Sequence, residues 1–154
     1  MGRVGAKGYG AGIVFGCVLL CSVAAMAQAT SAPGMATLEE PQVFVFDKVS
    51  PHKAANGSDS RNLVRGLLKS GEAVAVHESL QPAGVAPVPQ HVIQHSELIV
   101  VCEGTVAFEH GDRSETVGPG DVIYVPTGTM HRLRNTGAGT ARYVVLAIGG
   151  DTKK

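Results

Sequence analysis

The feature of this chain that most constrains its fold is a series of short apolar runs, each four to eight residues long. Gly, Pro, Asn and Asp stand between the runs, as in Gly111-Asp112 and Pro126-Thr127-Gly128. Strands spaced this closely, with no segment of helical periodicity, are typical of an all-β sandwich or barrel. The predicted strands are Val43–Phe46, Leu63–Leu68, Ala73–Leu80, Val85–Val88, Gln90–Ile93, Leu98–Glu103, Thr105–His110, Ser114–Val117, Val122–Val125, Met130–Arg134 and Ala141–Ile148.

Two stretches fall outside this pattern. Lys48–Asn62, which contains Ser50-Pro51 and Asn56-Gly57, is the longest break between apolar runs, and we expect it to be a surface loop. Residues 30–42 are small, polar and Pro-containing, which is typical of a loose arm. A single barrel domain is therefore expected over residues 43–150, with its core over residues 63–148.

The N-terminus has the pattern of an export signal. Arg3 and Lys7 precede seventeen uncharged residues, Ala11–Ala27, and small residues of the form Ala-x-Ala follow. This order of basic, apolar and small residues is that of a cleaved signal peptide. A retained membrane anchor is the alternative, but seventeen residues are short for a span of roughly 20. We therefore expect residues 1–29 to be removed after Ala29, leaving a periplasmic or secreted protein that is not membrane-bound.

Charge and cysteine content exclude several classes of protein. The chain has 13 basic and 13 acidic residues and no run of Lys or Arg, so it lacks the bulk positive field that would hold nucleic acid. Only Cys102 remains after cleavage, which excludes an intrachain disulfide scaffold and a cysteine-rich zinc knuckle. Cys102 has an even sequence number and Glu97 an odd one, so their side chains point to opposite faces of a strand. Cys102 is therefore expected to face away from the interior.

Histidine placement indicates where chemistry can occur. His91, His95 and Glu97 lie close together in the sequence, and His131 lies on a later predicted strand. A turn near residues 94–96 would let His91 end one strand and Glu97 begin the next, so that pairing of adjacent strands brings them together. Without that turn, the two residues would lie roughly 20 Å apart along one extended strand and could not share a ligand.

The other histidines have simpler interpretations. His77 sits near a strand end beside Glu78, and we expect a partly buried, hydrogen-bonded imidazole there. His52 and His110 lie in or beside polar turns and are expected to be solvated. Asn135 shares the parity of His131 and is expected to satisfy backbone groups at the closing end of its sheet.

Two segments around these residues resemble the two motifs of the cupin family. The stretch Gly120-x5-Pro126-x-Gly128-x2-His131-x3-Asn135 matches the second motif at every defined position. The first motif is matched less fully. Glu97-x6-Gly104 fits and His91 takes the place of the first histidine, but Ile93 stands where the second is expected. The resemblance implies an all-β cupin double-stranded β-helix, that is, a jelly-roll barrel.

The resemblance also implies a metal site. His91, Glu97 and His131 take the positions of ligands to a divalent ion, which can be Fe, Mn or Zn. Because an isoleucine at position 93 cannot coordinate, His95 is the further candidate ligand. His95 can equally be a hydrogen-bond partner of the site, a general base beside the metal, or an exposed loop residue.

What the resemblance implies about function is broader. Similar cupins include dioxygenases, decarboxylases, isomerases and lyases, so we expect a small metal-dependent enzyme that acts on a small oxygen-rich molecule. A non-catalytic cupin that binds a small ligand outside the cytoplasm is the alternative, which the loss of the second histidine at Ile93 favours. Cupins commonly pair through an N-terminal strand, so Val43–Phe46 predicts a homodimer.

Overall fold

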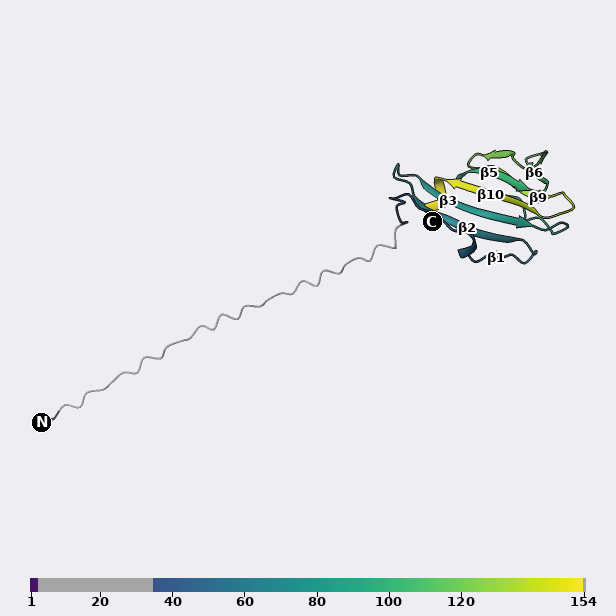
Figure 1. Cartoon of the computed structure of the whole chain (residues 1–154). Coiled ribbons are helices and arrows are strands. Elements are labelled where there is room, and N and C mark those ends of the chain that lie inside the picture. The colour runs from purple at the N-terminus through teal and green to yellow at the C-terminus, as the bar shows by residue number, and fades with distance from the viewer. Residues whose placement is uncertain (3–34, 154) are drawn as a thin grey trace. The chain divides into compact units, whose positions relative to one another are not determined.

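The computed structural model describes residues 1–2 and 35–153, and its regular secondary structure is almost wholly antiparallel β-strand (Figure 1). The predicted export signal lies outside the described residues. A six-stranded sheet has the order β1-β2-β3-β10-β5-β8, and a four-stranded sheet has the order β4-β9-β6-β7. The strands are β1 (His52–Lys53), β2 (Asp59–Leu67), β3 (Ala73–Gln81), β4 (His91–Val92), β5 (Ser96–Glu103), β6 (Val106–His110), β7 (Arg113–Val117), β8 (Val122–Val125), β9 (Met130–Asn135) and β10 (Ala141–Ile148).

The sheet topology confirms the predicted all-β jelly roll. Strands adjacent in space are often distant in sequence, and β10 lies between β3 and β5 (Figure 1). Two short 3-10 helices, η1 (Phe46–Lys48) and η2 (Gly150–Lys153), flank the strands. In the part of the chain that the structure describes, no helix is long and apolar enough to cross a membrane.

The core lies between the two sheets and follows the period-2 alternation of the strands. On β10, Tyr143 and Val145 are buried, while their neighbours along the strand are only partly covered. On β5, Ile99 and Val101 face the same interior. Cys102 lies on the opposite face and is half-buried, with its Sγ donating to the carbonyl of Val100, which confirms its predicted orientation.

The end of the barrel is closed by a polar interlock around Asn135. Its Nδ2 donates to the carbonyls of Gln81 and Gly139, both at 2.7 Å, and its Oδ1 accepts the N–H of Gly137 at 2.9 Å. Gln81 completes the interlock, because its Oε1 accepts the N–H of Asn135 at 3.0 Å and its Nε2 donates to the hydroxyl of Tyr143 at 2.8 Å. The predicted role of Asn135 in satisfying backbone groups is confirmed.

Two predicted strands are wrong. Val43–Phe46 is extended but unpaired, and η1 begins at Phe46. This segment has no strand partner among the described residues, so apolarity alone did not make it a strand. Val85–Val88 is also outside every strand, because Pro87 and the following Pro89 have no N–H to give to a ladder. The homodimer stays a prediction, but the strand that was to carry it is absent.

The predicted surface loop over Lys48–Asn62 is wrong in part. It contains β1 and the first four residues of β2, which pair with each other through His52↔Ser60 and Lys53↔Asp59. The start of β2 also pairs with β3, as in Asn62↔His77. These residues are polar because one face of the hairpin lines a cavity, so they lack the apolar pattern that marks a packed strand.

Candidate functional site

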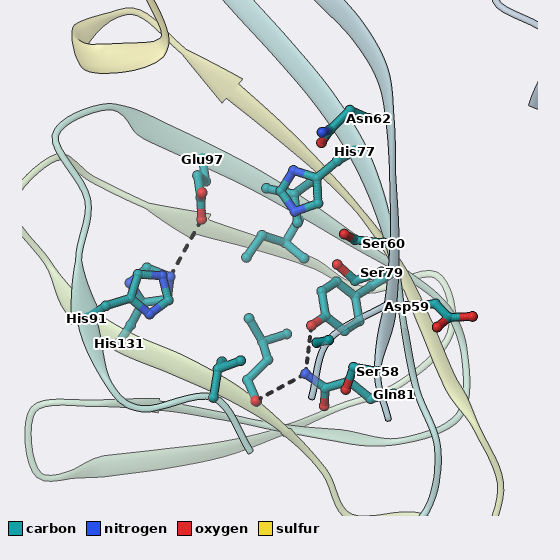
Figure 2. Close-up of a pocket in the computed structure, with 16 residues that line it drawn as sticks. Ser58, Asp59, Ser60, Asn62, His77, Ser79, Gln81, His91, Glu97 and His131 are labelled. Carbon is teal, nitrogen blue, oxygen red and sulfur yellow. Dashed lines mark hydrogen bonds and ion pairs between the residues drawn. The ribbon is translucent and has the colours of Figure 1, made fainter. Parts of the chain in front are cut away.

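A cavity of about 330 Å³ opens between the two sheets (Figure 2). At one side of it lie His91, Glu97 and His131. Across from them is a set of uncharged polar side chains, here called the polar wall, consisting of Ser58, Ser60, Asn62 and Ser79. The predicted ligand positions His91, Glu97 and His131 therefore share one cavity with a surface that sequence reasoning had not assigned to a site.

His91 and His131 are neighbours across two paired strands. Their Cα atoms are register partners on β4 and β9, and their ring centroids lie 4.9 Å apart. In each ring Nδ1 contacts a backbone carbonyl, that of Pro89 at 3.2 Å for His91 and that of Thr129 at 3.1 Å for His131. A carbonyl oxygen only accepts, so Nδ1 carries the proton, and Nε2 is the nitrogen of each ring left for a further partner.

Glu97 is the buried carboxylate of the site. It begins the inward-facing row of β5 and is 8% exposed. Its Oε1 lies 2.9 Å from Nε2 of His95, and its Oε2 lies 3.5 Å from Nε2 of His131. Burial by itself raises the pKa of Glu97, but the hydrogen bonds from His131 and His95 outweigh it and hold the pKa below its ordinary value.

His131 is affected by the same contact in the opposite sense. Burial by itself lowers its pKa, but the hydrogen bonds to the Glu97 carboxylate and to the carbonyl of Thr129 raise the pKa above its ordinary value. Without a metal ion, the two side chains therefore form a contact pair in which each favours the charged form of the other. Such a pair keeps a negative charge and a nitrogen donor facing each other at the side of the cavity.

His95 lies on the other side of the Glu97 carboxylate from the main cavity. It is half-buried in the bend between β4 and β5 and lines a second cavity of about 240 Å³, together with Glu97, His77 and Arg65. It is not among the residues that line the larger cavity. In the structure His95 is a hydrogen-bond partner of Glu97, and its role as a further metal ligand or general base stays a prediction.

The donor set suits a divalent metal, although its atoms are not gathered around one point. Two imidazoles and one carboxylate are ligands that Zn, Fe and Mn accept. Among the described residues, however, no three His, Cys, Asp or Glu side chains are arranged to hold an ion. The Glu97 carboxylate instead contacts Nε2 of His95 and Nε2 of His131 directly. Metal ligation by His91, His95, Glu97 and His131 therefore stays a prediction.

Ile93, which takes the place of the second histidine, belongs to the apolar core. It is 6% exposed and lies in the cluster that includes Ile99 and Phe108. This position therefore contributes packing rather than a metal ligand.

Sequence reasoning missed part of His77's role. His77 is half-buried as predicted, but it makes no hydrogen bond to another described residue and lines both cavities. Burial lowers its pKa and outweighs the opposing effect of Glu97, so the imidazole is neutral at pH 7. The position of His77 could have been inferred from the alternation of side chains along β3, because His77, Ser79 and Gln81 form one inward-facing row.

The prediction of a solvated His110 is wrong, whereas His52 is exposed as expected. His110 is half-buried, its Nε2 lies 2.8 Å from Oε1 of Glu115, and its ring stacks on Phe108 at 4.6 Å. It is the register partner of His131 on β6, but it does not line the larger cavity.

Comparison with known proteins agrees with this architecture. Residues 76–147 match the family model described as Cupin domain. Protein SchB of Streptomyces halstedii is 29% identical over 112 residues, which cover 70% of this chain and 78% of that protein.

Two solved structures share the fold at low sequence identity. A predicted oxalate decarboxylase of Thermotoga maritima aligns with a TM-score of 0.59 at 16% identity, covering 70% of this chain and 98% of that one. The polyketide cyclase RemF of Streptomyces resistomycificus aligns with a TM-score of 0.57 at 20% identity, covering 73% of this chain and 86% of that one. Residues 76–147 thus match the cupin domain model, and the described chain has the cupin jelly-roll fold.

Proposed function

We propose that this protein is a metal-dependent cupin enzyme that acts on a small oxygen-rich molecule in the cavity between the two sheets. The observation that carries the proposal is the orientation of His91 and His131. Both rings donate Nδ1–H to a backbone carbonyl, which leaves Nε2 of each for a metal beside the Glu97 carboxylate. Fixing the second ring nitrogen in this way is the usual support for a metal-ligating histidine.

Each residue of the site has a task in this proposal. His91, Glu97 and His131 would hold the ion, and His95 would orient the carboxylate through its 2.9 Å contact. A bound divalent ion supplies a Lewis acid with coordination positions open to substrate oxygens. The apolar side chains of Ile99, which lines the cavity, and its neighbours limit the access of water. The names of the two similar structures, a predicted oxalate decarboxylase and a polyketide cyclase, are compatible with an enzyme of this type.

A non-catalytic cupin that binds its ligand without turnover is the second candidate. The observation that favours it is Ile93, which packs into the apolar core where a further imidazole ligand would stand in a four-ligand site. The two candidates differ in whether bound small molecules are chemically altered. Mass spectrometry of metal-loaded protein incubated with a panel of small hydroxy acids, enediols and phenols distinguishes them.

Elemental analysis tests the metal proposal. We expect the full chain, purified without chelator or histidine tag, to contain about one equivalent of Fe, Mn or Zn, and His131→Ala to lose it. His52→Ala is the matched control, because His52 is exposed and does not line the cavity. The proposal fails if the wild-type chain takes up none of the three metals, or if His131→Ala binds metal as well as His52→Ala does.

A further inference from the structure

The polar wall is a hydrogen-bonding surface on the side of the cavity away from His91 and His131 (Figure 2). Its residues come from the β1–β2 turn, from β2 and from β3. Ser58 is the most informative of them. Its Oγ is buried and has no hydrogen-bond partner among the described residues. A buried hydroxyl without a partner is unfavourable, because it has lost its hydrogen bonds to water and gained none in the protein.

No cationic side chain reaches this wall. None of the residues that line the cavity is a lysine or an arginine, among those that the structure describes. Asp59 contributes to the lining, but its carboxylate points away from the cavity in Figure 2 and pairs with Lys53 at 3.1 Å. His77, beside the wall, is half-buried, and burial disfavours the charged form of its imidazole. The wall therefore offers hydroxyl and amide groups but no positive charge.

The rest of the cavity is mostly apolar. Ile99, Leu133 and Val145 also line it, and all three are buried. The volume of about 330 Å³ is near the lower end of the range for small-molecule sites. A compact molecule with a flat or apolar middle and polar groups at both ends matches this arrangement.

We propose that the polar wall selects a neutral ligand, one that carries hydroxyl, carbonyl or amide groups at the end facing Ser58, Ser60 and Ser79. This inference rests on the proposed function, in which the opposite end of the ligand supplies oxygens to the metal. A carboxylate or phosphate at the wall would lose its hydration and receive only uncharged donors, so it would be buried without a counter-charge. The wall therefore excludes ligands that are anionic at this end.

A pair of matched ligands tests this selection. Protocatechuate and its amide share a catechol ring and differ only in carrying a carboxylate or a carboxamide on the side away from the diol. Calorimetry of the zinc-loaded full chain at pH 7 gives the dissociation constant of each, after correction for their binding to free zinc. We expect the amide to bind about tenfold more tightly or better, because only the carboxylate brings an unpaired charge to the wall.

Two lysine variants supply the matched control. Asn62→Lys adds a cation to the wall at an exposed position and should reduce or reverse the preference for the amide. Ser114→Lys adds the same charge on β7, at an exposed position that does not line the cavity, and should leave the preference unchanged.

Zinc content measured on the same samples separates this inference from the proposed function. A chain that takes up none of zinc, iron and manganese overturns the proposed function, and a chain that takes up only iron or manganese is titrated in that form. A zinc-loaded chain that binds the carboxylate as tightly as the amide, or binds neither, overturns the selection by the wall. A preference that Asn62→Lys leaves intact overturns it as well.

Discussion

Replacing Gln81 by methionine tests whether the polar interlock at the end of the barrel stabilises the fold. The buried Gln81 side chain donates to the hydroxyl of Tyr143 at 2.8 Å and accepts the N–H of Asn135 at 3.0 Å, with a longer contact of 3.5 Å to the carbonyl of Leu133. Methionine keeps a similar volume and flexible shape but can replace neither bond, so the main loss is that of hydrogen bonding.

The expected magnitude follows from the two short bonds. Each buried polar group that loses its partner costs about 1–3 kcal/mol. The hydroxyl of Tyr143 lies beside the cavity, where water can replace part of the lost bond, so we place the total for Gln81→Met at about 3 kcal/mol. Urea unfolding followed by circular dichroism measures the loss, provided that wild type and variant share the same m-value.

The control for this measurement is the same substitution at an exposed glutamine. Gln42 lies outside the strands and is exposed, so Gln42→Met should change stability by less than about 0.5 kcal/mol. If Gln81→Met lost no more stability than Gln42→Met, the hydrogen bonds at the barrel end would contribute nothing net. The argument that they hold β3, β9 and β10 together would then be wrong.

Four further predictions concern other parts of the molecule. Gly104→Ala should lower the free energy of unfolding in urea by more than about 2 kcal/mol, since φ is +77° and a Cβ would lie 2.7 Å from the Cα of Ala141. Gly71→Ala is the control and should lower it by only about 1 kcal/mol, because φ is +98° but no atom lies within 4 Å of the added Cβ. Ile93→His should tighten zinc binding about tenfold in a dye competition assay if the site has three protein ligands, and unchanged binding would argue against that. Glu109 has its pKa held below 4.5 by its hydrogen bonds to two arginines, so the stability difference between wild type and Glu109→Gln should be present at pH 7 and vanish as the pH falls through the folded-state pKa. Intact-mass measurement of the exported protein should give a chain that begins directly after Ala29, and retention of the leader would contradict the predicted cleavage.

Most of the fold could be predicted because its packed strands have distinct patterns. The bounds of β8 and β10 agree with those predicted, and β3 extends only one residue further than expected. Buried residues alternate with partly exposed ones in β10 and with exposed ones in β8, and turn residues mark the ends of both strands. The predicted strand over Val43–Phe46 failed for a different reason: an apolar run becomes a strand only where a neighbouring strand offers hydrogen bonds, and sequence alone does not identify that neighbour.

The candidate site was predictable where motif and turn act together. A bend at Gln94 and His95 interrupts the chain as the sequence indicated, but it leads from β4 in one sheet to β5 in the other. The expected pairing of these two strands is therefore wrong, and His91 and Glu97 line one cavity from opposite sheets. The sequence left the role of His95 open, because the direction of a side chain in a bend follows no simple parity rule. Its contact with Glu97 required the three-dimensional path of the chain.

The polar wall was not predicted because, on its strands, polar side chains face the interior and apolar ones face outward, which is the reverse of the usual pattern. On β3 the apolar Val76 and Leu80 lie on the outer side, while His77, Ser79 and Gln81 point inward. In a strand that packs against a core, the same alternation indicates a solvent-facing row. Gln81 is satisfied in this row by Tyr143 and Asn135, but the nearby Oγ of Ser58 is buried without a partner among the described residues, which is unfavourable. The proposed ligand would bond to groups of this surface, and their lack of charge limits what that ligand can carry.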